Sequence, residues 1–114
     1  WDWNVLINHI LELITANGIQ RNLSILGGEP LDTYDKRDFI RLLIKVVKSR
    51  FPDIVICIWT GYTYETLKHR FNEPRLKSIL DKINVLVDGE YDESQRDVSL
   101  AFRGSSNQRI IYLN

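Results

Sequence analysis

Apolar residues recur along the start of the chain with the spacing of an amphipathic helix. In residues 3–17 they stand three and four positions apart, at Leu6, Ile7, Ile10, Leu11 and Ile14. Asp2 or Asn4 can cap the start of this helix, and Gly18 can close it in the left-handed conformation. The pattern therefore predicts a first helix over residues 3–17.

Three further helices are predicted later in the chain, two of them from the same apolar spacing and one from its cap. Asp35 can cap the first of them, which ends at Phe51-Pro52 because proline disfavours helical backbone in the preceding residue. Its apolar stripe is Phe39, Leu42, Leu43, Val46 and Val47. Thr63 can cap a short helix through Arg70, and Pro74 stands in the first turn of the last helix. The stripe of that last helix is Leu76, Ile79, Leu80 and Ile83.

Short apolar runs alternate with these helices and predict strands over residues 23–26, 54–59, 85–87 and 110–113. The run 54–59 is continuously apolar, which is typical of strands covered on both faces in a parallel sheet. Cys57 lies in its middle and is expected to be an inert core residue, because burial among aliphatic side chains raises the pKa of a thiol. Strand–helix units in series predict one α/β domain over residues 1–114, with a parallel sheet and right-handed crossovers.

Three of the predicted strands end in polar turns that contain glycine, namely Gly27-Gly28-Glu29, Thr60-Gly61-Tyr62 and Asp88-Gly89-Glu90. In a parallel sheet these turns share the carboxyl edge, where α/β proteins bind ligands. Glycine lets the backbone approach a ligand closely, Glu29 adds a carboxylate beside bare backbone groups, and Pro30 stiffens the exit. One such turn equally describes a plain strand-to-helix connection. Three together predict a binding site.

Composition narrows the class of protein. The 114 residues are 44% apolar and 26% charged, as in an ordinary globular domain. Fifteen basic residues balance fifteen acidic ones, so no net field favours nucleic acid or an anionic membrane surface. No apolar run approaches the ~20 residues of a membrane helix. A single cysteine excludes an internal disulfide and suits the reducing cytoplasm.

Four segments carry a family resemblance: LSILGGEPL, IWTGYTYE, NVLVDGEYDESQRD and LAFRGSSNQRII. Together they resemble the activating proteins of anaerobic ribonucleoside-triphosphate reductases, small members of the radical S-adenosylmethionine (SAM) superfamily. The resemblance covers nearly all of the chain from Leu23 onward, and the last two segments make it specific. It implies a partial (βα) barrel of the radical SAM type, with the reductase as partner.

The resemblance also implies a particular chemistry. In this family three cysteines of a C-x-x-x-C-x-x-C loop hold a [4Fe–4S] cluster, and the amino and carboxylate groups of SAM chelate the fourth iron. Electron transfer then cleaves SAM to a 5′-deoxyadenosyl radical, which removes a hydrogen atom from a glycine of the reductase. No side chain of the chain is expected to be catalytic, because hydrogen abstraction by a carbon radical needs no general base. The cofactor supplies the reactivity and the fold positions it.

Carried onto this sequence, the resemblance assigns the SAM amino group to the backbone and carboxylate of the first turn. The residues of this site are Gly27, Gly28, Glu29 and Pro30. An amine needs acceptors, which a freed strand end and a carboxylate offer.

The second turn is expected to contact the adenosyl or methionine part of SAM through Thr60, Gly61 and Tyr62, although Tyr62 is equally explained as a packing aromatic. Asp88 accepts hydrogen bonds either from the ligand or Arg103, or belongs to a structural salt bridge. Residues 103–109 are expected to contact the SAM carboxylate or the partner, since their guanidinium groups suit carboxylates.

The sequence departs from the family in lacking the cysteine loop, since Cys57 stands alone in a strand. The chain has no methionine, and Trp1-Asp2-Trp3 is similar to the segment that follows the loop in the family. We therefore expect an inactive piece cut after its cluster loop, without a cluster and without its first strand. Residues 23–26 would then form a sheet edge, which we expect to be covered by another chain or a rearranged N-terminus, or to be poorly ordered.

An alternative function remains open beside the activase. The chain can be a non-catalytic module that binds SAM, another nucleotide-like ligand or a partner through its glycine edge. A generic Rossmann-like nucleotide domain is disfavoured, because no G-x-G-x-x-G motif opens a helix.

Overall fold

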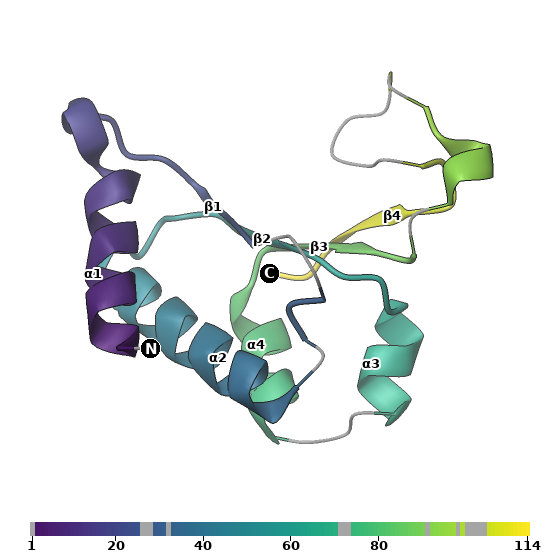
Figure 1. The fold of residues 1–114 in the computed structure, drawn as a ribbon, viewed down its shortest axis with the longest axis horizontal. Coiled ribbons are helices and arrows are strands. Elements are labelled where there is room, and N and C mark those ends of the chain that lie inside the picture. The colour runs from purple at the N-terminus through teal and green to yellow at the C-terminus, as the bar shows by residue number, and fades with distance from the viewer. Residues whose placement is uncertain are drawn as a thin grey trace.

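The computed structural model describes residues 2–25, 29–31, 33–70, 74–90, 92–97, 99 and 105–114. Its helices are α1 (Trp3–Ile14), α2 (Tyr34–Arg50), α3 (Tyr64–Arg70) and α4 (Pro74–Lys82), with short 3₁₀ turns η1 (Ala16–Gly18) and η2 (Glu93–Gln95). Its strands are β1 (Leu23–Ile25), β2 (Ile56–Trp59), β3 (Val85–Asp88) and β4 (Arg109–Tyr112). They form one sheet in the order β1-β2-β3-β4 (Figure 1).

The sheet is mostly parallel, as the sequence predicts. β1, β2 and β3 run parallel, with Ile25 opposite Ile58 and Trp59 opposite Val87. β4 is antiparallel to β3, which the sequence pattern did not indicate. Among the described residues between β3 and β4 there is only the short turn η2, so no crossover helix is available to return the chain in parallel. The fold is an α/β domain with an open sheet, not a closed barrel.

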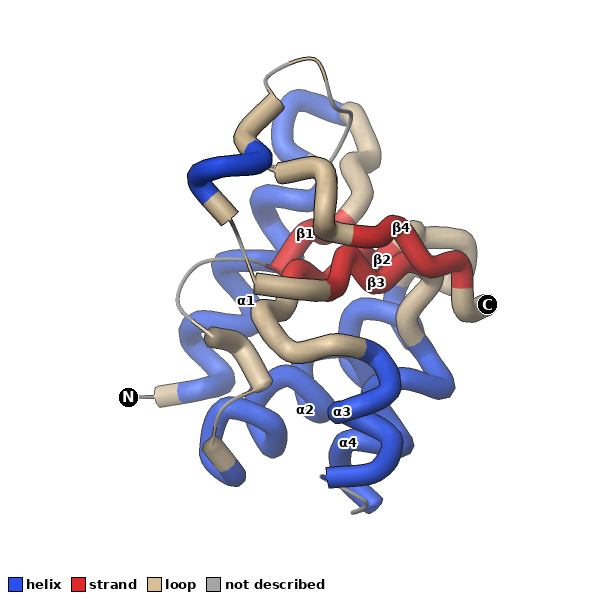
Figure 2. Tube along the Cα trace, turned by 90° about the vertical axis from the view of Figure 1, so that its right-hand side faces the viewer, coloured by secondary structure: helices blue, strands red, loops and turns tan. Residues whose placement is uncertain are grey.

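α2, α3 and α4 lie on one side of this sheet, and α1 stands beside its β1 edge and contacts α2 (Figures 1 and 2). Ile56 and Ile58 of β2 are fully buried in the core beneath them. Cys57 and Trp59 alternate with them and are only half-buried, because successive side chains of a strand point to opposite faces. The sequence predicted that both faces of β2 are buried. Among the described residues only one face is fully buried. Partial burial raises the pKa of the Cys57 thiol to about 11, the direction that the sequence predicted, and its inertness stays a prediction.

α2 is apolar on two adjoining faces. Toward the sheet it buries Ile40, Leu43, Ile44 and Val47. Phe39, Leu42 and Val46 of the predicted stripe are half-buried against the core, and the Phe39 ring meets Trp3 of α1 edge-on at 5.6 Å between centroids. The predicted stripe was thus rotated by about one position, since a stripe read from sequence cannot tell which of two apolar faces meets the sheet.

The two long helices begin at side-chain caps. Asp2 caps α1 by accepting from the backbone N–H groups of Asn4 and Val5 at 3.0 and 3.4 Å. The predicted cap Asp35 is wrong for α2, because extended Thr33 accepts from the N–H of Lys36 at 3.2 Å and leaves Asp35 in the first turn. α1 ends at Ile14, earlier than predicted, and Gly18 then takes the expected left-handed conformation with φ of 72°.

β1 is an edge strand, as expected. Within the part of the chain that the structure describes, it pairs with β2 alone, and Ser24 at its middle is exposed. What covers this edge stays a prediction.

Candidate binding site at the carboxyl edge of the sheet

The turns after β1, β2 and β3 lie on one edge of the sheet, which we call the rim and define as residues 29–31, 60–62 and 88–90. Because the three strands are parallel, each delivers its following turn to this edge. Of the predicted site residues, Glu29, Pro30, Thr60, Gly61, Tyr62 and Asp88 are described. Gly27, Gly28 and Arg103 lie outside the described residues.

The Glu29 carboxylate joins the first turn to the second. Its Oε1 accepts from the backbone N–H of Gly61 at 2.7 Å, and its Oε2 accepts from the backbone N–H of Leu31 at 3.0 Å. The hydroxyl of Thr60 lies 3.0 and 2.9 Å from the two oxygens and donates to them. Both oxygens that sequence reasoning offered to a ligand therefore already accept hydrogen bonds from the protein.

Backbone hydrogen bonds join the second turn to the third. The N–H of Thr60 donates to the carbonyl of Val87 at 3.0 Å, and the N–H of Gly89 donates to the carbonyl of Tyr62 at 3.1 Å. Gly89 has φ of 96°, a left-handed conformation that favours glycine. The predicted convergence of the turns on one edge is confirmed for their described residues.

Tyr62 is half-buried and packs against the hydrophobic core. This contact accounts for the aromatic ring as a packing residue, one of the two explanations that the sequence left open. A contact between Tyr62 and a ligand stays a prediction.

Asp88 belongs to a salt bridge at the end of β3. It is fully buried, and its Oδ2 accepts from the backbone N–H of Tyr64 at 2.8 Å. The guanidinium of Arg109 donates to both Asp88 oxygens and also to both oxygens of Glu65, the latter at 3.0 and 2.7 Å. The structural salt bridge that the sequence left open is thus present, with Arg109 as the cation. We call Glu65, Asp88 and Arg109 the arginine cluster.

The arginine cluster shifts the ionisation of its exposed members. Hydrogen bonding from Arg109, with smaller contributions from the Glu65 backbone and from charge, lowers the pKa of Glu65 from 4.5 to about 2. The carboxylates of Asp88 and Glu65 in turn raise the pKa of Arg109. Arg109 therefore bridges two carboxylates of its own chain, where the sequence had assigned it to a ligand or partner.

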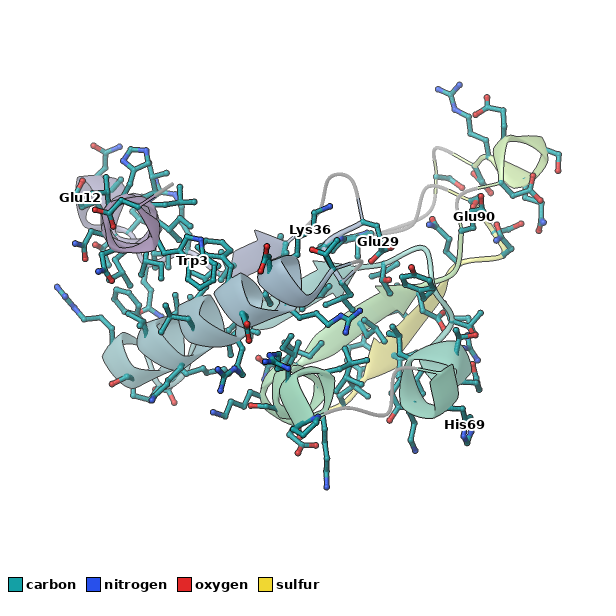
Figure 3. All side chains as sticks on the ribbon, turned by 60° about the horizontal axis from the view of Figure 1, so that its bottom comes forward. Trp3, Glu12, Glu29, Lys36, His69 and Glu90 are labelled. Carbon is teal, nitrogen blue, oxygen red and sulfur yellow. The ribbon has the colours of Figure 1, made fainter. Side chains whose placement is uncertain are left out.

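Sequence reasoning missed a second cation at the rim. The exposed Lys36, in the first turn of α2, donates from Nζ to the backbone carbonyl of Glu29 at 3.3 Å, and Figure 3 shows the two residues side by side at the start of the helix. The sequence signal that could have located Lys36 at the rim is the helix cap Thr33. A helix that begins after Thr33 places Lys36 next to the preceding turn.

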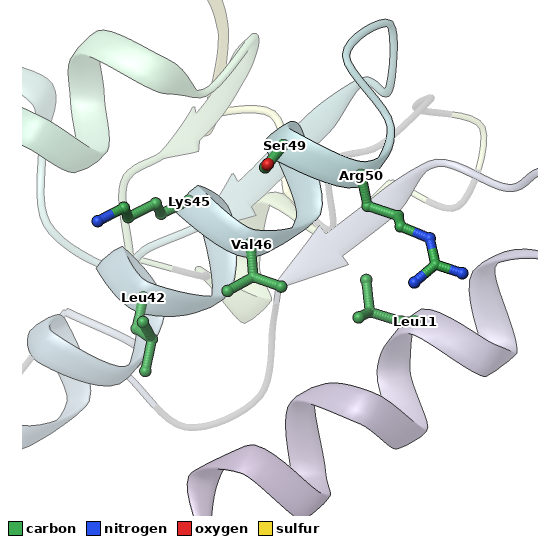
Figure 4. Close-up of a pocket in the computed structure, with 6 residues that line it drawn as sticks. All are labelled: Leu11, Leu42, Lys45, Val46, Ser49 and Arg50. Atoms are coloured by element: carbon green, nitrogen blue, oxygen red, sulfur yellow. The ribbon is translucent and has the colours of Figure 1, made fainter.

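A separate groove lies between α1 and the C-terminal half of α2, far along the helix from the rim (Figure 4). It has a volume of about 500 Å³ and is lined by Leu11, Leu42, Lys45, Val46, Ser49 and Arg50. Its lining includes none of the predicted site residues.

The chain does not supply an obvious ligand set for an iron–sulfur cluster. Such clusters are held by cysteine thiolates, and Cys57 is the one cysteine of the sequence. Within the described ranges, no three His, Cys, Asp or Glu side chains are grouped to hold a metal ion. No helix of that same part of the chain is long and apolar enough to cross a membrane.

Comparison with known proteins identifies the class of protein to which the chain is similar. The family model for a 4Fe-4S single cluster domain matches residues 3–111. Three curated relatives are each called anaerobic ribonucleoside-triphosphate reductase-activating protein. The relative from Pasteurella multocida is 40% identical over 106 residues, covering 90% of this chain and 63% of its own length.

The Escherichia coli K12 relative is 35% identical over 94 residues, covering 82% of this chain and 57% of its own. The Haemophilus influenzae relative is 31% identical over 112 residues, covering 93% and 68%. The chain belongs to the family of anaerobic ribonucleoside-triphosphate reductase-activating proteins. It spans 57% of the length of the Escherichia coli relative and 63% of the length of the Pasteurella multocida relative. No solved structure matches it.

Proposed function

We propose that this chain provides the SAM-binding part of an activating protein that generates the glycyl radical of an anaerobic ribonucleoside-triphosphate reductase. The observation that carries the proposal is the joining of the strand-end turns into one rim. Glu29 binds Thr60 and Gly61, and Gly89 binds Tyr62, so segments distant in sequence form one edge. Family membership supports the reductase as partner.

At this rim the turn of Gly27, Gly28, Glu29 and Pro30 would receive the amino group of SAM, and residues 60–62 would line the adenosyl or methionine part. The contact of Lys36 supports the first assignment, because its ammonium group lies 3.3 Å from the Glu29 carbonyl. A backbone acceptor of this turn is thus accessible to a primary amine. Asp88 and Arg103 stay proposed ligand contacts, with Asp88 also bound to Arg109. A reduced [4Fe–4S] cluster held elsewhere would supply one electron to the bound SAM, which would yield methionine and the 5′-deoxyadenosyl radical that takes a hydrogen atom from the reductase glycine.

The cluster does not fit the residues of this chain, because Cys57 is a lone, half-buried thiol. We propose that the chain as given binds SAM weakly and forms no cluster of its own. Anaerobic reconstitution with iron and sulfide should leave it without a stable brown chromophore. A full [4Fe–4S] spectrum would contradict this assignment.

Calorimetric titration with SAM tests the binding role. We expect heat of binding for the unmodified chain and none for Gly28→Val, because a branched side chain would occupy the space of a close backbone approach. Glu12→Gln is the matched control, since this exposed residue lies on α1, away from Glu29 (Figure 3). Equal affinities of the unmodified chain and Gly28→Val would refute the SAM site.

The lone cysteine favours a second candidate, a non-catalytic module that binds SAM or a partner. The two functions differ when this chain is joined to the three-cysteine loop of a curated relative and its cluster is reconstituted. Incubated anaerobically with reductase, SAM and a reductant, that joined protein should give a glycyl-radical signal in electron paramagnetic resonance if the chain belongs to an activase. If the chain is a module that only binds SAM or the reductase, the signal should be absent.

A further inference from the structure

We infer that the Glu29 carboxylate is a positioning group that ties the first turn of the rim to the second, and does not itself face the ligand. We call this arrangement the Glu29 clasp; it comprises the Glu29 carboxylate and its donors Leu31, Thr60 and Gly61. The inference concerns the same rim as the proposed function and rests on that function where it concerns SAM.

The acceptors of Glu29 are satisfied within the chain. Each carboxylate oxygen takes one backbone N–H, from Gly61 at 2.7 Å or from Leu31 at 3.0 Å. Both also contact the Thr60 hydroxyl. Hydrogen bonds to an ionised acceptor are stronger than those between neutral groups. A ligand amine at these oxygens would have to displace donors that the fold already provides.

The Thr60 hydroxyl is itself oriented. Its side chain is buried, with 4% of the residue exposed, and its Oγ1 accepts from the backbone N–H of Tyr62 at 3.2 Å. With one lone pair directed to that N–H, the single hydroxyl hydrogen remains available for Glu29. Thr60 is therefore the specific partner of the carboxylate.

The carboxylate also rests directly against the backbone at position 61. A Cβ built on Gly61 would lie 3.4 Å from Oε1 of Glu29, which is the distance of a van der Waals contact. On its other side the carboxylate binds Leu31, which is fully buried. Glu29 thus spans from the core to the open edge and sets the spacing of the two turns.

Glutamine cannot replace Glu29 in this geometry. Whichever way its amide is turned, the NH₂ group faces either the N–H of Gly61 or that of Leu31, and two donors meet. Thr60→Val removes the hydroxyl at nearly constant shape, whereas Thr60→Ser keeps it. Glu12→Gln makes the same chemical change at an exposed site on α1 and serves as the control.

Amide hydrogen exchange of the unliganded protein tests the clasp without SAM. In Glu29→Gln the Gly61 amide should exchange about tenfold faster or more, because it loses a charge-assisted hydrogen bond. The rate should be unchanged in Glu12→Gln. Unchanged Gly61 exchange in Glu29→Gln would overturn the proposal.

A double-mutant cycle of SAM affinity tests positioning against direct contact. Glu29→Gln and Thr60→Val should each weaken binding about tenfold, and together no more than either alone, because both break the same clasp. Thr60→Ser should retain the unmodified affinity. Additive losses would show that Glu29 contacts SAM independently of Thr60 and would overturn the proposal.

Two further outcomes keep the tests separable. If Glu29→Gln does not fold, the contrast between Thr60→Val and Thr60→Ser decides the proposal, since only Val lacks the hydroxyl. If the unmodified chain shows no SAM binding while Gly61 exchange responds as expected, the proposed function fails and the clasp stands.

Discussion

Two carboxylates at the carboxyl edge of the sheet, one in the turn after β1 and one at the end of β3, are held in different ways. Glu29 is bound by neutral donors, two backbone N–H groups and one hydroxyl. Asp88 is fully buried and bound by the guanidinium of Arg109, which also holds Glu65. A buried charge that loses its counter-ion is costly, whereas a carboxylate at an open edge can be rehydrated. We therefore expect the hydrogen bonds of the arginine cluster to be more costly to break than those of the Glu29 clasp.

The largest effect is expected from Arg109→Met, which leaves the buried Asp88 without its cation. The unfolding temperature should fall on the order of 10 °C, measured by circular dichroism. Adding Asp88→Asn should recover part of this loss, because the uncompensated charge is removed. If Arg109→Met lowered the unfolding temperature less than Thr60→Val does, the contrast between the arginine cluster and the Glu29 clasp would be wrong.

Loss of the Thr60 hydroxyl should matter less. Thr60→Val should lower the free energy of unfolding by about 1 kcal/mol, the usual cost of one hydrogen bond. Urea titration measures this effect, with Thr60→Ser close to the unmodified protein. A cost equal to that of Arg109→Met would show that the clasp is as rigid as the cluster.

The arginine cluster also predicts that the free energy of unfolding falls in acid. Because the pKa of Glu65 falls from 4.5 in the unfolded chain to about 2 in the folded one, its stabilising contribution is complete above about pH 4.5. It is lost as the pH falls toward 2. In Glu65→Gln the urea midpoint should therefore change less over this range. The same acid dependence in both proteins would contradict the assignment.

The smallest effect is expected at Lys36. Lys36→Gln removes the ammonium from the Glu29 carbonyl, and SAM affinity should rise by about twofold, since an exposed contact of this kind is weak. Lys77→Gln, at an exposed position of α4, is the matched control. Weaker SAM binding in Lys36→Gln would show that the lysine assists the ligand.

Much of the fold could be predicted because its signals are local. Apolar spacing located each helix and strand, and their alternation predicted the parallel order of β1 to β3. The direction of β4 could not be predicted, because an apolar run has no direction. Thr33 and Asp35 are both good caps, and the choice between them depends on how the chain enters α2.

The sequence predicted at which edge of the sheet the candidate site lies. It did not predict the hydrogen-bond partners of the side chains there. Three glycine turns after parallel strands are enough to place residues 60–62 and 88–90 beside one another. The partners of each side chain depend on tertiary distances, so Arg109 lies 21 residues from Asp88 in sequence and still binds it. The same reason hid the pairing of Glu29 with Thr60, which are 31 residues apart.

The antiparallel course of β4 has a practical consequence for handling the molecule. The strand starts opposite Asp88 and ends with Tyr112 opposite Val85, so it carries the chain away from the rim. Asn114 then donates from Nδ2 to the carbonyls of Leu80 and Ile83 at the end of α4. An affinity tag or surface linker attached there would orient the immobilised molecule with its rim toward the flowing sample, suited to biosensor measurements with large analytes.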